Sequence, residues 1–275
     1  MFDLLSVGAG ATQLYRSALT TVSNNIANMN TDGYTRQVSS SEQNTPILQG
    51  GGYIGSGAHL GNITRAFSEF NESNLRNSSS ELATQDPMIK YADRIVDVMG
   101  SDTSSLSGAF DQFFSSASNL SSDPASGALR NLFLRDADGL AIRFRELDGQ
   151  LNNIEDETQS EINLKLTTLN ELGKQLYAVN QQLSKKTTLD TQPANLLDER
   201  DSILRDMADI TKIHVKQSTS GTVEIRLDNE NGTSAVDPLR ATVFSANFNA
   251  AQPGAVEILA NVYGAPGPTN SVTGG

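Results

Sequence analysis

The stretch LAIRFRELDGQLNNIEDETQSEINLKLTTLNELGKQLYAVNQQL, residues 140–183, decides the fold of this chain. Its apolar residues recur at spacings of four and three, which is typical of a helix that packs along one seam. An eight-residue step from Ile154 to Ile162 shifts the seam slightly around the helix. The seam residues are Leu140, Phe144, Leu147, Leu151, Ile154, Ile162, Leu166, Leu169, Leu172 or Gly173, Leu176, Val179 and Leu183. We therefore expect one long, coiled-coil-like helix.

A second helix follows this one after a polar turn. Pro193 opens it, and its apolar residues allow it to fold back on the long helix as an antiparallel hairpin. Within it, the run Asp198-Glu199-Arg200-Asp201 offers carboxylates beside an arginine. Adjacent residues on a helix point in different directions. We therefore expect these side chains on a solvated outer face, or in a salt link across the hairpin, rather than in an acid–base pair.

Helical spacing also extends upstream, and strand patterns follow downstream. Residues 70–99 are expected to form two helices that meet at Asp86-Pro87, and residues 109–120 form another with phenylalanines on one side. After residue 212 the pattern alternates around Ser220-Gly221, which predicts a β-hairpin. Residues 239–248 and 255–263 can add strands, whereas the tail 264–275 has no expected element.

The N-terminus carries a separate amphipathic helix, from Leu4 to Met29. Because its stripe is thin and rich in alanine, and no partner lies next to it in the sequence, we expect it to be poorly ordered until it packs against other copies. Asparagine, aspartate and glycine at residues 28–33 then end the helix. The stripe residues are Leu4, Ala11, Tyr15, Ala18, Val22, Ile26 and Met29.

These elements predict a mainly α fold with a smaller β part. The order is an N-terminal assembly helix, a long antiparallel helical bundle or coiled-coil hairpin, and the start of a β-domain. The expected domains are residues 1–36, an extended connector with a helical bundle at 37–212, and a β-rich outer domain at 213–275.

Composition excludes several classes of function. The 275 residues include 20 Lys and Arg against 32 Asp and Glu, a formal charge of −12, which disfavours a nucleic-acid partner. There is no cysteine, so disulfides, thiolate metal sites and cysteine nucleophiles are excluded. No stretch approaches the roughly 20 apolar residues of a membrane span, and the N-terminus lacks the basic region of a cleavable secretory signal. A protein partner fits this chain better.

No constellation in the sequence predicts catalysis. His59 and His214 have no acidic residue at a metal-ligand spacing, so structural or solvent-facing roles are expected. The glycines 50, 52 and 55 match a dinucleotide-loop spacing without the βαβ unit that it needs, and residues 228–232 lack the closing glutamate of a calcium loop. We expect no catalytic, cofactor-binding or metal residues, no cofactor, and no enzyme.

Two long motifs carry a resemblance to a known family. SNNIANMNTDGYTRQ, residues 23–37, resembles the N-terminal signature of the bacterial flagellar rod, hook and hook-associated axial proteins. Within that group, GGYIGSG at 51–57, ITR at 63–65 and NLLDERD at 195–201 resemble the hook-associated proteins of the hook–filament junction. The resemblance covers residues 1 to about 227, and continued helices through residue 210 favour the junction proteins over rod and hook subunits.

The resemblance implies a structural subunit that forms a ring at the distal end of the hook. Its implied partners are other copies of itself, hook subunits, a second hook-associated junction protein with the filament side, and a flagellar export chaperone. It implies type III export from the cytoplasm to the extracellular flagellum. The family closes its chain with a C-terminal helix that pairs with the first one; none is found here, which suggests a fragment.

The same resemblance assigns residues to assembly, with Ile26 as an apolar contact, Gly33 as the turn, and Tyr34 and Arg36 docking the connector. The implied interface is Leu4, Ala11, Tyr15, Ala18, Val22, Asn24, Asn25, Ile26, Asn28, Asn30, Gly33, Tyr34 and Arg36; the hairpin motif is Leu196, Leu197, Asp198, Arg200 and Asp201. Two alternatives remain: a hook or distal-rod subunit, and a cell-wall hydrolase, which would need two converging carboxylates.

Overall fold

A computed structural model describes residues 4–100, 106–249, 252, 254–262 and 270–271, and its contacts divide the chain into two compact units. One unit comprises the described parts of Met1–Ser80, Asn170–Val243 and Val262–Gly267; the other comprises those of Glu81–Leu169, Phe244–Asn261 and Pro268–Gly275. The helices are α1 (Leu4–Ala27), α2 (Glu69–Met99), α3 (Leu106–Ser122), α4 (Gly127–Leu183), the 3-10 turn η1 (Leu189–Thr191) and α5 (Ala194–Ala208). The mainly α fold is confirmed.

The core of the first unit lies between the end of α4, helix α5 and a sheet. The expected hairpin is present, with Pro193 at the N-cap of α5. The buried side chain of Gln192 donates to the carbonyls of Leu183 and Ser220, each at 2.6 Å, and so fixes the turn between the helices. The core side chains include Leu176, Val179, Leu183, Leu204, Met207, Val223, Ile225 and Val236. The expected seam is therefore buried from Leu169 to Leu183, whereas Ile162 and Leu166 are half-buried.

The sheet after α5 is antiparallel where its register is defined. Its strands are β5 (Ile213–Gln217), β6 (Val223–Leu227), β7 (Ser234–Asp237), β8 (Arg240–Phe248), β9 (Val256–Val262) and β10 (Asn270–Ser271), hydrogen-bonded in sequence order. The predicted hairpin is β5–β6, with Val215 opposite Ile225. One expectation is wrong: the tail contains β10, because Asn270 and Ser271 pair with Ala260 and Leu259 of β9.

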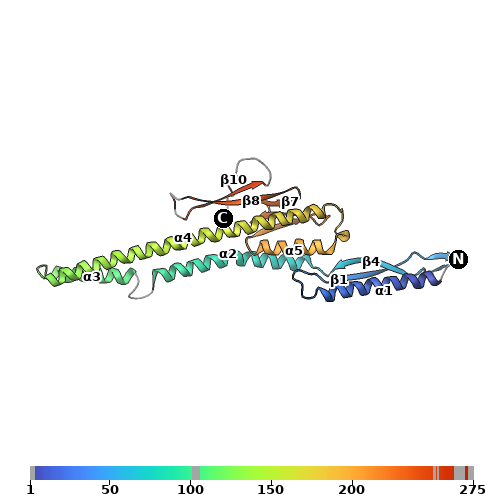
Figure 1. The fold of residues 1–275 in the computed structure, drawn as a ribbon, viewed down its shortest axis with the longest axis horizontal. Coiled ribbons are helices and arrows are strands. Elements are labelled where there is room, and N and C mark those ends of the chain that lie inside the picture. Colours follow the sequence, from blue (N-terminus) through green and yellow to red (C-terminus); the bar gives the residue numbers. More distant parts are fainter. Residues whose placement is uncertain (1–3, 101–105, 250–251, 253, 263–269, 272–275) are drawn as a thin grey trace. The chain divides into compact units, whose positions relative to one another are not determined.

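Residues 4–65 form what we call the N-terminal arm. Strands β1 (Gln37–Gln43) and β4 (Ala58–Arg65) pair antiparallel, β2 (Ile47–Gln49) and β3 (Gly52–Ile54) form a hairpin between them, and α1 lies along β1 and β4 (Figure 1). The sequence suggested no partner for α1 within the chain. That expectation is wrong for one face of the helix, because the strands that cover it come after the turn and reverse the direction of the chain.

The second unit contains the remaining helical pairing. Arg94 and Tyr91 of α2 contact Glu157 and Glu161 of α4, and phenylalanines from α3 and α4 form a cluster in which the Phe113 and Phe133 rings lie 5.3 Å apart. The expected break at Asp86-Pro87 is wrong, because α2 continues through Pro87. Helix α4 starts at Gly127, with the Ser126 hydroxyl accepting from the Leu129 amide at 3.4 Å. Between α2 and α3 the sequence has a polar segment that predicts a break, and residues 101–105 of that segment lie outside the described residues.

Candidate functional site

The asparagine-rich signature joins α1 to β1 through the side chain of Asn25. Its Oδ1 accepts from the Tyr34 hydroxyl at 2.7 Å and from the Gln37 amide at 2.8 Å, and its Nδ2 donates to the Gln37 carbonyl at 2.8 Å. The amide group thus pairs with the first residue of β1 as a neighbouring strand would. This explains why the signature needs an asparagine here, since only a carboxamide offers a donor and an acceptor at this spacing.

Two further asparagines close the end of α1. The side-chain nitrogen of Asn28, Nδ2, donates to both the backbone carbonyl and the side-chain oxygen of Asn24, each at 2.9 Å. The Thr31 hydroxyl donates to the side-chain oxygen of Asn28 at 3.3 Å. These bonds link the last turn of α1 to the residues that follow it, and the Asn24 carbonyl also accepts from the Asn28 backbone amide at 3.1 Å. The chain then turns at Gly33, whose φ of +77° lies in the region that favours glycine. Asn30, which was also expected in the interface, is exposed.

Tyr34 connects this signature to α5. Its hydroxyl accepts from Asn24 at 3.3 Å in addition to donating to Asn25. Burial, together with the nearby carboxylate of Asp198, raises the pKa of Tyr34 above 10.0. The phenol therefore stays protonated at neutral pH and remains a donor. Arg36 is exposed, and only its backbone carbonyl is engaged, accepting from the Ala66 amide at 2.7 Å.

The acidic run on α5 is where the structure departs furthest from the sequence-based expectation. Asp198, Arg200 and Asp201 are buried, with only Glu199 exposed, so the predicted solvated face is wrong for three of the four residues. Nη1 of Arg65, at the end of β4, lies 2.7 Å from Oδ1 of Asp198 and 2.8 Å from Oδ2 of Asp201. The two carboxylates do converge, but on a guanidinium.

The same carboxylates make two further contacts. The other oxygen of Asp198 accepts from the Thr35 amide at 3.2 Å. Asp201 also accepts from Nε of Arg200 at 2.8 Å, and Arg200 donates to the Gly221 carbonyl at 2.7 Å. Each buried charge therefore has an opposite charge or a hydrogen-bond partner, which is the condition for tolerating it in a protein interior. Since these oxygens are occupied by arginines and a backbone amide, the arrangement is that of a structural junction.

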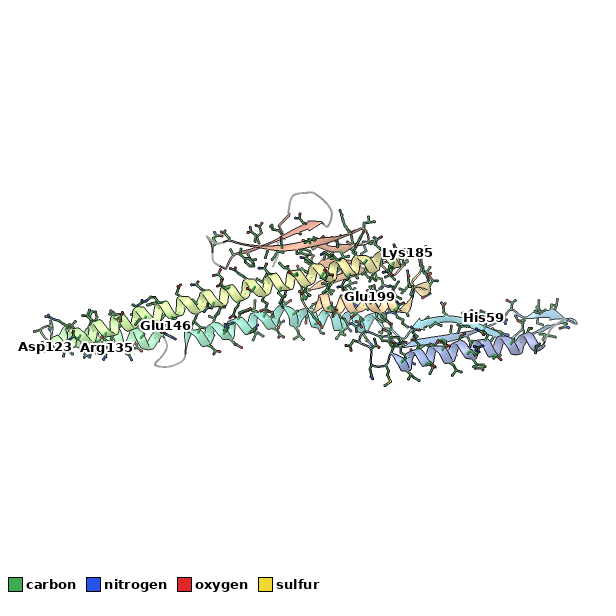
Figure 2. The ribbon with its side chains drawn as sticks, viewed as in Figure 1. His59, Asp123, Arg135, Glu146, Lys185 and Glu199 are labelled. Carbon is green, nitrogen blue, oxygen red and sulfur yellow. The ribbon has the colours of Figure 1, made fainter. Side chains whose placement is uncertain are left out.

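A polar hollow of about 450 Å³ lies between the signature and α5. Gly33 faces α5 here, because a Cβ atom added to it would lie 3.5 Å from Ser202 and 3.7 Å from the Arg205 guanidinium. Arg205 in turn lies 3.3 Å from Glu72 at the start of α2. Figure 2 labels Glu199, which lines the hollow from α5. The hollow is lined by Asn24, Asn28, Thr31, Asp32, Gly33, Tyr34, Gln37, Asn195, Asp198, Glu199 and Ser202.

The face of the arm away from its strands carries exposed apolar side chains. Five of them follow spacings of four and three and are between 51% and 73% exposed. We call this set the apolar seam: Tyr15, Leu19, Val22, Ile26 and Met29. The remaining expected stripe residues Ala11 and Ala18 are half-buried, and Leu4 is the first residue of α1. Residues of one predicted stripe thus divide between a packed face and a free one.

Sequence reasoning found both motifs but missed the residues that join them. Leu197 is buried beneath the motif and Leu196 is half-buried, in keeping with a helix docked on one side. Arg65 and Thr35 received no role, although Arg65 belongs to the ITR sequence that carried part of the resemblance. A lone basic residue at the end of a strand was the only available signal, and nothing local connects it to a carboxylate 133 residues away.

Other candidate chemistry is sparse in the described part of the chain. His59 is exposed and its Nδ1 lies 2.6 Å from the Asn44 side-chain oxygen, and His214 is half-buried with Glu230 at 4.0 Å. The described residues contain no group of three His, Cys, Asp or Glu side chains that could hold a metal ion. None of the described helices combines the length and apolar character that crossing a bilayer requires.

Comparison with known protein families gives two matches. Residues 92–275 match the family described as the flagellar hook-associated protein FlgK helical domain. Residues 5–35 match the flagella basal body rod protein family, and this match covers α1 and most of the signature. Between them the two matches leave out residues 36–91, which hold the strands of the arm and most of α2.

Relatives and a solved structure agree with these matches. The chain is 28% identical over 258 residues to flagellar hook-associated protein 1 of Salmonella typhimurium, covering 88% of this chain and 47% of that protein. It is 26% identical over 225 residues to the Bacillus subtilis protein of that name, covering 79% and 44%. The flagellar hook junction protein FlgK from Burkholderia pseudomallei superposes with a TM-score of 0.65 at 19% identity, covering 72% of this chain and 35% of that one. The chain spans about half the length of the relatives it matches.

Proposed function

Because the chain belongs to the family of the flagellar hook-associated protein FlgK, we propose that it is a structural subunit of the bacterial flagellum that polymerises at the distal end of the hook and forms the junction with the filament. It acts by packing against other copies of itself and against hook subunits, without catalysis. Its other partners are a second hook-associated protein on the filament side and an export chaperone. It is made in the cytoplasm and exported by the flagellar type III system.

The apolar seam of α1 is the observation that carries this proposal. A seam of five large apolar side chains, more than half exposed, is costly to leave in water, and its spacing suits a partner helix. The opposite face of α1 is already satisfied by β1 and β4, so the seam is free to meet a neighbouring subunit. The arm therefore has the two properties that an assembly element needs: it is held within its own subunit and unsatisfied outside it.

This proposal assigns a separate role to each part of the chain. Residues 1–36 supply the inner assembly helix, residues 37–212 the connector and helical bundle, and residues 213–275 a β-rich outer part. The residues assigned to assembly separate into two groups. Tyr15, Val22 and Ile26 contact neighbouring copies, whereas Asn25, Gly33 and Tyr34 keep α1 folded against β1 so that it presents them. The described residues from 69 to 208 are mostly helical, which disfavours a β-rich hook or rod subunit.

The experiment introduces a charge into the apolar seam, in a strain that expresses the variant protein from its own gene. Ile26→Asp puts a carboxylate where an apolar contact is required, and burying an unpaired carboxylate is strongly unfavourable. We expect hooks without filaments by electron microscopy, loss of swimming, and normal amounts of the variant in the culture medium. Its presence in the medium separates failed assembly from failed export.

Leu239→Asp is the matched control, because Leu239 is 81% exposed and lies outside the arm. It makes the same chemical change on a surface that the proposal leaves free, and it should support filaments and swimming. Normal filaments in the Ile26→Asp strain would contradict the proposed role of the seam. Loss of filaments in both strains would show that any added charge is harmful.

A further inference from the structure

We infer that Asp198 is the positioning residue of the arm: this one carboxylate ties two segments of the N-terminal arm to helix α5, and so sets the direction in which the apolar seam points. Two segments of the arm lie against α5, and we call them the crossings. The first, residues 33–36, lies inside the arm and leads from α1 into β1, and the second, residues 65–68, leads out of the arm from β4 into α2.

Asp198 binds one end of each crossing. Its Oδ2 accepts from the Thr35 amide at 3.2 Å on the first crossing, and its Oδ1 binds the Arg65 guanidinium at 2.7 Å on the second. The two crossings are also bonded to each other, since the Ala66 amide donates to the Arg36 carbonyl at 2.7 Å. The carboxylate thus closes a ring of contacts that includes α5 and both crossings.

Burial strengthens the polar contacts that make up this ring. The side chains of Arg65 and Asp198 are 7% and 10% exposed, so water competes weakly for their charges and the hydrogen bonds are charge-assisted. Arg65 is further held over the Phe67 ring, 4.4 Å from its centroid. Asp201 contributes on the second crossing only, at 2.8 Å from Arg65, and its other oxygen serves Arg200 within α5. Asp198 is the residue common to both crossings.

The internal structure of the arm does not depend on Asp198. Helix α1 is bound to β1 by the Asn25 and Gln37 bonds, and β1 is paired with β4 from Gln37 opposite Arg65 to Gln43 opposite Ala58. Loss of Asp198 should therefore free the arm as an intact module rather than unfold it. This separates positioning from folding in a way that an experiment can resolve.

The test is amide hydrogen exchange, residue by residue, on the unassembled full chain. In Asp198→Ala, which keeps a good helix former in α5, we expect the Thr35 and Ala66 amides to exchange about tenfold faster or more. Amides inside α1 and in the β1–β4 pairing should keep their rates, as should those of Leu204 and Met207 in the core of α5. Asp198→Asn keeps an oxygen for the Thr35 amide but no charge for Arg65, so it should accelerate Ala66 more than Thr35.

Glu199→Ala is the matched control, since it removes the same charge from the next residue of α5, where the side chain is exposed. It should leave every rate unchanged. Unchanged rates at Thr35 and Ala66 in Asp198→Ala would overturn the inference. Faster exchange at Leu204 and Met207 as large as that at Thr35 would also overturn it, because Asp198 would then hold the core. The exchange rates are read without assembly, so this result is independent of whether the proposed flagellar function is correct.

Discussion

Asn180 of α4 and Val223, the first residue of β6, are joined by two hydrogen bonds in which a side-chain amide replaces a neighbouring strand. The Val223 amide donates to Asn180 Oδ1 at 2.9 Å, and Asn180 Nδ2 donates to the Val223 carbonyl at 2.8 Å. Asn25 binds Gln37, the first residue of β1, in the same way at 2.8 Å for both bonds. The chain thus uses one device twice to fasten a helix to the start of a strand.

The two positions differ in burial, which predicts unequal costs. Asn180 and Val223 are almost completely buried, so Asn180→Leu leaves a buried N–H and a buried carbonyl without partners. We expect a loss of roughly 2 to 4 kcal/mol in the free energy of unfolding. Asn25 is half-buried and water can reach its partners, so Asn25→Leu should cost about 1 kcal/mol. Urea unfolding followed by circular dichroism measures both.

The control for these variants is Asn153→Leu, an exposed asparagine on the same helix α4. It makes the same chemical change where no buried group loses a partner, so its effect should stay within about 0.5 kcal/mol. Equal losses for Asn180→Leu and Asn153→Leu would mean that helix propensity, and not the paired hydrogen bonds, determines the cost.

The turn at Gly33 predicts an order among three substitutions. Its φ of +77° strains any residue with a Cβ, by about 1 to 2 kcal/mol for alanine and less for asparagine. The added Cβ would meet Ser202 at 3.5 Å, an ordinary contact, so strain alone sets the cost of Gly33→Ala. Gly33→Val adds branched atoms toward Ser202 and Arg205. Stability measured by urea unfolding should therefore fall in the order Asn, Ala, Val. A valine variant as stable as the alanine variant would show that α5 moves to accommodate the larger side chain at no cost.

The acidic run of α5 shows which structural features helical periodicity predicts and which it does not. Asp198 and Asp201 are three apart, so the helical repeat does place both on one face, beside the buried Leu197 and Leu204. Nothing in the local sequence predicts that this face is buried, because its counter-charge is Arg65 from β4. A salt bridge of this kind depends on the tertiary arrangement, whereas the hairpin of α4 and α5 depends on spacing and on Pro193, which are local.

Two other departures have the same cause. At Asp86-Pro87 the sequence carries a helix start signal, yet α2 continues, and its next two turns are held by contacts of Tyr91 and Arg94 with α4. Tertiary packing of a helix can override a local stop signal such as a proline. Similarly, the sequence predicts that the stripe of α1 is one face awaiting neighbours, whereas Ala11 and Ala18 of that stripe are half-buried and the helix packs on strands that follow later in the chain. The family was identified correctly because the motifs that carry the resemblance are long.

The contacts between α2 and α4 predict a dependence on acid. A hydrogen bond from Arg94 lowers the pKa of Glu157 below 4.5, and a hydrogen bond from Tyr91 lowers that of Glu161. Carboxylates with a lowered pKa in the folded state stabilise it fully above the unfolded value and lose that contribution as the pH falls through the folded value. These contacts should therefore hold at neutral pH and weaken below about pH 4.5.

Carbon-13 NMR titration of the two carboxyl groups tests this assignment. In Arg94→Gln the pKa of Glu157 should rise toward 4.5 while that of Glu161 changes less. In Tyr91→Phe the pattern should reverse, since the largest cause of the lowered Glu161 pKa is removed. If Glu157 titrates identically with and without Arg94, the ion pair does not persist in solution.

The distribution of charge predicts how self-association responds to salt. Residues 1–67 contain three arginines and three acidic residues, so the whole net charge of −12 lies in residues 68–275. Subunits that meet through their neutral arms must bring these acidic parts together, and the repulsion is screened over about 10 Å at 0.1 M salt and about 3 Å at 1 M. Sedimentation velocity at fixed protein concentration should therefore show more association as sodium chloride rises from about 0.05 to 1 M. Ile26→Asp should remain monomeric throughout, because the seam supplies the attraction and salt only removes the opposition. Association that decreases with salt would instead show that ion pairs between subunits hold them together.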